Sequence, residues 1–220
     1  ETEKTVEFKD LISTSAEIWA KISAESKALP EFNLEKIIGA AELLLEERAN
    51  LCDLIVVSDV AAAGKSTVSS AFEEALMHGH VPALVLHDRV SFAMENVIIA
   101  WDGSGQAARA LKAANYFIEK AKSVTILQIQ EKDIASSNLM HDPYKLAAWL
   151  AKKGVKAKVQ IESCNGKSVG AAIIEVATAA NADLLIAGAY GHSRAREFVF
   201  GGVTKNYLKN AQGPHLLISH

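Results

Sequence analysis

Short apolar runs of strand length alternate along the chain with longer segments in which apolar residues recur at helical spacing. The clearest series of apolar runs is Val97–Trp101, Val124–Ile129, Val155–Ile161, Asp183–Ala189 and His215–Ser219. The segments between them that carry helical periodicity are 104–121, 144–153, 169–180 and 203–211. Continuous apolar strands that alternate with helices predict an α/β protein, with a parallel sheet covered by helices on both faces.

An internal repeat divides the chain into two copies. The run Cys52–Ser58 matches Ala182–Gly188, with Asp53 and Asp183 lying 130 residues apart, and Val81–His87 matches Gly213–Ser219, with the two prolines 132 apart. Residues 91–220 form a complete second copy. Residues 1–90 form a partial first copy, for which we expect helices over about 10–29, 40–50 and 69–78 and strands over 34–38, 53–58 and 82–87. This first copy lacks the first strand, the first helix and the second strand of the other.

Composition and charge exclude several classes of protein. The chain has 220 residues, of which 50% are hydrophobic and 22% charged, which is typical of a globular protein. No apolar run reaches the roughly 18 residues of a membrane-spanning helix, and two isolated cysteines suit a reducing cytoplasm. Residues 1–90 carry a net charge of −8 and residues 91–220 one of +5. The two segments either differ in surface role, attract one another, or simply have solvated charged faces. Neither has the dense basic stripe of a nucleic-acid-binding protein.

Two segments of the second copy are predicted to meet at the carboxyl ends of its strands, where such sheets bind ligands. One is the turn Asp102–Ser104, in which Ser104 is a candidate helix N-cap. The other begins at Gly188 and Gly191 and continues to Gly201 and Gly202 before the last helix. Glycines let a phosphate approach backbone N–H groups, and a helix N-terminus favours an anion. Alternatively, these glycines are needed only to turn the chain tightly.

The second segment resembles the G-x2-G-x9-G-(S/T) nucleotide signature of the universal stress protein family. Residues 91–220 resemble a whole domain of that family, in tandem with the rear portion of a first domain in residues 1–90. The resemblance implies a five-stranded parallel sheet of the adenine nucleotide alpha hydrolase type, with ATP held between strands one and four. The resemblance implies that Asp102 contacts the nucleoside end of ATP and that the glycines hold its ribose and phosphates. The chain departs from the pattern at Gly202, where the family has Ser or Thr. The residues predicted to bind the nucleotide are Asp102, Gly188, Gly191, His192, Gly201, Gly202, Val203 and Thr204.

The first copy is predicted to have lost this site. Ser58 and Ala61 stand where the second copy has Gly188 and Gly191, and no counterpart of Asp102 exists. The nearby run Ala63–Thr67 resembles the end of a P-loop, but Asp59 replaces its first glycine, and a polar surface loop is the better interpretation.

These features favour a cytoplasmic, regulatory stress-response protein in which ATP acts as an occupancy signal for an unidentified protein partner. No metal site for Mg²⁺ and no general base are evident, so any hydrolysis is expected to be slow. The alternative function is an interaction module that binds no nucleotide. In either case we expect a homodimer, formed through the sheet edge at Leu216–Ile218. An enzyme of the nucleotide alpha hydrolase kind fits the scaffold, but no residue demands it. Because the first copy lacks its central strand, we expect either residues outside this sequence or another segment to fill the gap.

Overall fold

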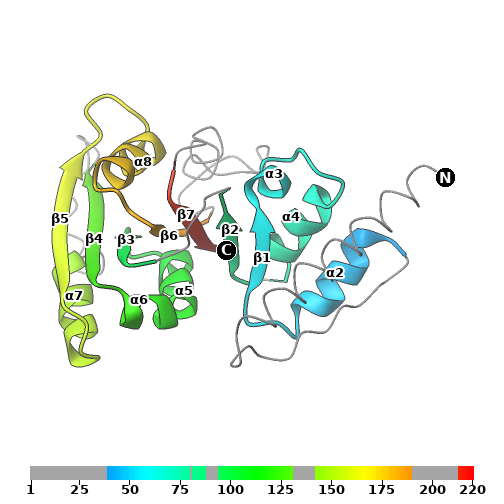
Figure 1. Ribbon diagram of the computed structural model, residues 1–220, viewed down its shortest axis with the longest axis horizontal. Helices are drawn as coiled ribbons and strands as arrows, with labels where there is room; N and C mark the ends of the chain where they lie inside the picture. Colours follow the sequence, from blue (N-terminus) through cyan, green and yellow to red (C-terminus); the bar gives the residue numbers. More distant parts are fainter. Residues whose placement is uncertain (1–38, 80, 88–93, 131–141, 190–212) are drawn as a thin grey trace, which may run out of the picture. The chain divides into compact units, whose positions relative to one another are not determined.

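A seven-stranded sheet runs through the computed structural model, within the residues that the structure describes (39–79, 81–87, 94–130, 142–189 and 213–220) (Figure 1). All of these residues belong to one unit, Gly39–His220. The strands lie in the order β1-β2-β7-β6-β3-β4-β5. Their bounds are β1 Ile55–Ser58, β2 Ala83–Leu86, β3 Asn96–Ala100, β4 Ser123–Gln130, β5 Ala157–Ser163, β6 Leu184–Gly188 and β7 His215–Ser219.

The predicted α/β architecture is confirmed, and the five strands of the second copy do form a parallel block, β7-β6-β3-β4-β5. The sheet is nevertheless not limited to five strands. β2 of the first copy pairs antiparallel with β7, with Leu84 opposite Leu217, and β1 pairs parallel with β2. The two copies therefore share one sheet, because β2 satisfies the backbone groups that β7 would otherwise expose.

The expected dimer interface at Leu216–Ile218 is therefore wrong. These residues lie in β7, which pairs with β6 on one side and β2 on the other. Their exposed fractions are 0%, 0% and 1%. Because both edges of β7 are already paired within the chain, a second copy cannot add to this strand.

Helices cover both faces of the second copy, as predicted. One apolar layer joins the sheet to α4 (Ser69–Met77) and α8 (Val169–Ala179), and its core includes Phe72, Leu76, Ile173 and Ile174. The other joins the sheet to α5 (Gly105–Ala113), α6 (Asn115–Lys120) and α7 (Pro143–Lys152) (Figure 1). We call this second layer the α5 face. None of the helices in the described ranges is long and apolar enough to cross a membrane.

Two local expectations need correction. The helix expected over 104–121 divides at Ala114, whose ψ of 3° interrupts the helical backbone. Asn115 then begins α6 and uses its side chain to bond Glu119 and Lys153. The loop expected after the strand 53–58 begins with a short helix, α3 (Asp59–Ala62), because Ser58 caps it. Gly64 and Lys65 beyond α3 are exposed, as expected of a surface loop.

Helix α2 (Ala41–Ala49) packs beside α4. A hydrogen bond from the backbone amide of Glu42 lowers the pKa of its own carboxyl, and the Ser70 hydroxyl, which donates to Glu42 Oε1 at 2.8 Å, adds to this effect. Burial raises the pKa of Glu73, and the charge of Glu74 adds to the effect. The helices expected at 10–29 and 203–211, the strand at 34–38 and the boundary near Val90 lie outside the described residues. The division into residues 1–90 and 91–220 therefore stays a prediction.

Candidate functional site

The first segment of the predicted site is the turn that joins β3 to α5. Asp102 Oδ1 accepts a hydrogen bond from the Ser104 amide at 2.9 Å, and Gly103 between them adopts a φ of +74°. Ser104 Oγ then accepts from the Ala107 amide at 3.1 Å, which confirms Ser104 as the N-cap of α5. Asp102 is half-buried, with one carboxylate oxygen engaged in the turn. The sequence Asp-Gly-Ser thus fixes a carboxylate at the carboxyl end of β3.

The second segment begins where β6 ends, at Gly188. β6 is the direct neighbour of β3, with Ile99 in register with Ile186, so both strands end at the same edge of the sheet. A Cβ placed on Gly188 would lie 2.7 Å from the Ala107 nitrogen and 3.0 Å from Gln106 Cβ. Only glycine lets the first turn of α5 approach β6 this closely. Close packing therefore accounts for Gly188 whether or not a ligand binds.

The other predicted nucleotide contacts lie outside the described residues. They are Gly191, His192, Gly201, Gly202, Val203 and Thr204, and they stay predictions. Across the described part of the chain, no group of three or more His, Cys, Asp or Glu residues is placed to hold a metal ion.

Strand order adds an observation that the sequence pattern alone did not supply. From β3 the chain continues to β4 and β5 on one side, whereas β6 and β7 lie on its other side. The order reverses between β3 and β6, which is the position where open parallel sheets form a ligand crevice. Asp102 and Gly188 follow those two strands. The Trp101 indole Nε1, one residue before Asp102, is buried and has no hydrogen-bond partner among the residues that the structure describes.

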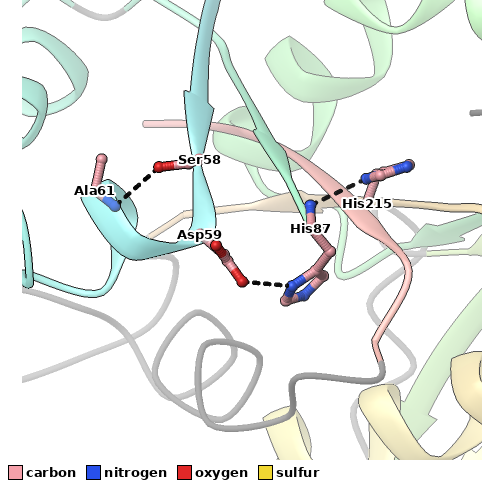
Figure 2. Close-up of polar contacts among 5 residues, drawn as sticks. All are labelled: Ser58, Asp59, Ala61, His87 and His215. Carbon is pink, nitrogen blue, oxygen red and sulfur yellow. Dashed lines mark hydrogen bonds and ion pairs between the residues drawn. The ribbon is translucent and has the colours of Figure 1, made fainter. Parts of the chain in front are cut away.

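The matching edge of the first copy is built differently. There Ser58 Oγ accepts from the Ala61 amide at 3.3 Å, so the two residues that stand in place of glycines form a helix cap (Figure 2). Asp59 Oδ2 lies 3.0 Å from His87 Nδ1, and the His87 side chain is only 2% exposed. A carboxylate can only accept, so His87 Nδ1 carries the proton. Asp59 and His87 thus join α3 to the end of β2.

His215 connects this cluster to the second copy. The His87 backbone amide donates to His215 Nδ1 at 3.2 Å, and His215 is 3% exposed (Figure 2). Since an amide can only donate, Nδ1 of His215 is unprotonated and the neutral ring carries its proton on Nε2. Sequence reasoning missed this cluster because residues 59, 87 and 215 share no local motif. The signal that could have found it is the pair of histidines at the ends of two apolar strands.

We expect His215→Leu to lower the free energy of unfolding by about 1 to 2 kcal/mol, because the buried His87 amide loses its acceptor. Urea unfolding followed by circular dichroism measures the change. His78→Leu is the control, since that side chain is 68% exposed and bonds only Glu74 one turn away among the described residues. Equal losses of unfolding free energy in both variants would show that the hydrogen bond between His87 and His215 contributes nothing specific to stability.

Comparisons with known proteins give consistent results. The sequence model of the Universal stress protein family matches residues 94–219. A universal stress protein from Archaeoglobus fulgidus superposes with a TM-score of 0.68 at 18% identity, over 95% of this chain and 79% of that one. A putative universal stress protein from Pseudomonas aeruginosa superposes with a TM-score of 0.61 at 14% identity, over 93% of this chain and 77% of that one. A functionally unknown protein from Pseudomonas aeruginosa superposes with a TM-score of 0.60 at 14% identity, over 93% of this chain and 76% of that one. No curated protein sequence matches the chain. At these identities the solved structures show a shared fold.

Proposed function

Since this chain belongs to the universal stress protein family, whose sequence model matches residues 94–219, we propose that it is a stress-response regulatory protein that binds ATP. The site is the edge of the sheet between β3 and β6. The observation that carries the proposal is the reversal of strand order there, with Asp102 and Gly188 following the two strands. That reversal is where a parallel sheet opens a crevice for a ligand.

The residues at this edge suit a nucleoside. Asp102 Oδ1 is held by the Ser104 amide, while no described residue bonds Oδ2. Oδ2 is left to accept from a ribose hydroxyl or the adenine amino group. The phosphates would extend past Gly188, over the predicted glycines at 191, 201 and 202. Backbone N–H groups bind phosphate without a charged side chain, so a Gly at position 202 is compatible with binding.

This arrangement favours binding over turnover. Among the described residues, no group of three or more His, Cys, Asp or Glu side chains is placed to hold a metal ion. ATP therefore serves as an occupancy signal, with at most slow hydrolysis. Protein partners would read the signal on the surface around this edge.

Asp102→Ala is expected to weaken ATP binding at least tenfold, measured by isothermal titration calorimetry. The reason is that one hydrogen bond to a charged group contributes about 1.5 to 3 kcal/mol. Asp102→Asn keeps an oxygen that accepts from the Ser104 amide, so this variant should lose less affinity for ATP. The matched control is Asp142→Ala, because Asp142 Oδ1 accepts from the Tyr144 amide at 2.9 Å in the same kind of turn, ahead of α7.

If the wild-type protein fails to bind ATP at millimolar concentration, the nucleotide proposal is wrong. The alternative, an interaction module that needs no ligand, would then stand. Equal effects of Asp102→Ala and Asp142→Ala would instead mean that binding does not depend on the carboxylate at the β3 edge.

A further inference from the structure

Three neighbouring strands end side by side at the edge where the nucleotide is proposed to bind. β7, β6 and β3 are consecutive in the sheet and parallel, so their carboxyl ends reach the same edge. Gly188 at the end of β6 is in register with Ser219 at the end of β7, and Asp102 follows β3. Adjacent strands lie about 4.8 Å apart, so a ligand that reaches from β3 to β7 crosses about 10 Å. The groups at the end of β7 therefore help to decide how such a ligand is oriented.

A guanidinium group lies at the end of β7. Arg109 belongs to α5, and its Nε donates to the backbone oxygen of His220 at 2.7 Å. His220 directly follows Ser219, the last residue of β7. Arg109 Nη1 also lies 3.3 Å from the position that a Cβ on Gly105 would take. The guanidinium is therefore on the α5 face, beside both the first turn of α5 and the end of β7.

The direction of α5 explains why this side chain reaches the edge of the sheet. The helix begins directly after the turn that follows β3, and helical side chains tilt toward the N-terminus of their helix. Arg109 stands one turn after Gly105, so its side chain extends back toward the edge. Ala110 and Leu111 beside it are buried, whereas Arg109 is exposed. A ligand at the edge can therefore reach the charged group.

The bond to His220 uses a small part of the hydrogen-bonding capacity of Arg109. An arginine side chain carries five N–H groups in a planar fork. The His220 oxygen accepts from the one on Nε, and no described residue accepts from the four on the two Nη nitrogens. Such a fork matches the paired oxygens of a phosphate group, to which arginine commonly donates two parallel hydrogen bonds. Arg109 is thus anchored at one nitrogen and can bind an anion with the other two.

Charge at this edge has a direction. A carboxylate, that of Asp102, follows β3, and the Arg109 guanidinium lies at β7, with β6 between them. Phosphate is repelled by the first group and attracted by the second. The Asp59 carboxylate is bonded to His87, whose amide bonds His215 at the start of β7. This cluster is separated from the end of β7 by about 16 Å of strand, so it does not neutralise Arg109.

We propose that Arg109 binds the phosphates of the nucleotide and thereby orients it, with the nucleoside at Asp102 and the phosphate chain directed past Gly188 toward the end of β7. This inference rests on the proposed function, because it concerns the same edge of the sheet. The Nη groups donate to phosphate oxygens while Nε keeps its bond to His220. Arg109 supplies a full positive charge, which backbone N–H groups lack. The site therefore selects a nucleoside polyphosphate over the nucleoside alone.

Isothermal titration calorimetry of the full chain with ATP and with adenosine, at one salt concentration, tests this assignment. Arg109→Ala should weaken ATP binding about tenfold or more, because hydrogen bonds to a charged group are lost, and should leave adenosine binding unchanged. Arg109→Lys keeps the charge without the fork, so its ATP affinity should lie between those of wild type and Arg109→Ala. Asp102→Ala should instead weaken both ligands by the same factor. Lys112→Ala is the control, since it removes an exposed cation from the same helix and should change neither affinity.

The salt dependence of ATP binding separates a phosphate contact from a structural role. Added KCl screens the attraction between Arg109 and phosphate. The ATP affinity of the wild type should therefore fall more steeply with KCl concentration than that of Arg109→Ala. Lys112→Ala should keep the steeper dependence of the wild type.

Three results would overturn the inference and leave the proposed function standing, because the wild type binds ATP in each. The first is equal ATP affinity of wild type and Arg109→Ala. The second is an equal loss of ATP and adenosine binding in Arg109→Ala, since Arg109 would then only support the edge of the sheet. The third is a loss in Lys112→Ala as large as that in Arg109→Ala. If the wild type binds neither ATP nor adenosine, the proposed function is wrong and the inference fails with it.

Discussion

Asp183→Ala is expected to lower the free energy of unfolding by about 2 to 4 kcal/mol. Its carboxylate accepts from two successive amides at the start of β3, and its own amide donates to the Asn96 carbonyl at 2.8 Å. Removal of the carboxylate leaves two amides without their charged acceptor, at a cost of about 1 to 2 kcal/mol each. Urea unfolding monitored by circular dichroism measures the loss, which should appear as a lower midpoint at unchanged slope.

The internal repeat supplies a matched control for this experiment. Asp53 occupies the equivalent position before β1 and bonds no described residue, so Asp53→Ala should change the free energy of unfolding by less than about 0.5 kcal/mol. If both substitutions destabilise the protein equally, Asp183 does not join the two strands in the way described. If neither does, solvent replaces the carboxylate at no cost.

The strands of the fold could be predicted from the sequence because each is a short apolar run bounded by polar residues. Apolar residues that are buried on both faces leave a continuous signal, and every described strand lies within two residues of its predicted bounds. The N-cap Ser104 could also be predicted, since its side chain bonds a residue only three positions away. The features that could be predicted from the sequence are therefore those that depend on residues close together in the chain.

Contacts between distant strands could not be predicted in the same way. The pairing of β2 with β7 joins residues more than 130 positions apart, and no pattern within either strand specifies the partner. The expectation of an exposed edge at Leu216–Ile218 failed for this reason: the apolar character that suggested an intermolecular interface reflects burial inside the chain. The Asp59–His87–His215 cluster depends on the same long-range pairing.

The candidate site was predictable in part. The Asp102 turn and the strand end at Gly188 follow from motif and strand order, and the structure brings both to one edge. The reason for a glycine at 188 was not visible in the sequence, because it depends on how closely α5 approaches β6. A sequence motif records that a side chain is absent but does not say whether a ligand or a helix requires it.

Gly188→Ala is the substitution with the other large expected effect, a loss of about 2 to 3 kcal/mol in the free energy of unfolding. The added Cβ would lie 2.7 Å from the Ala107 nitrogen and 3.1 Å from the Gln106 carbonyl carbon, both backbone atoms of a capped helix. Relief requires α5 to move away from β6, which opens a tightly packed layer. Thermal and urea unfolding both measure the change.

Gly105→Ala is the control, because it adds the same methyl group at the start of the same helix. The nearest atom to its Cβ is Arg109 Nη1 at 3.3 Å, the end of a flexible side chain that can move aside. Alanine is also favoured over glycine in a helix, so stability should be unchanged or slightly higher. A loss at position 105 as large as that at position 188 would mean that α5 tolerates no added volume anywhere in its first turn. Contact with β6 would then not be the reason for glycine at 188.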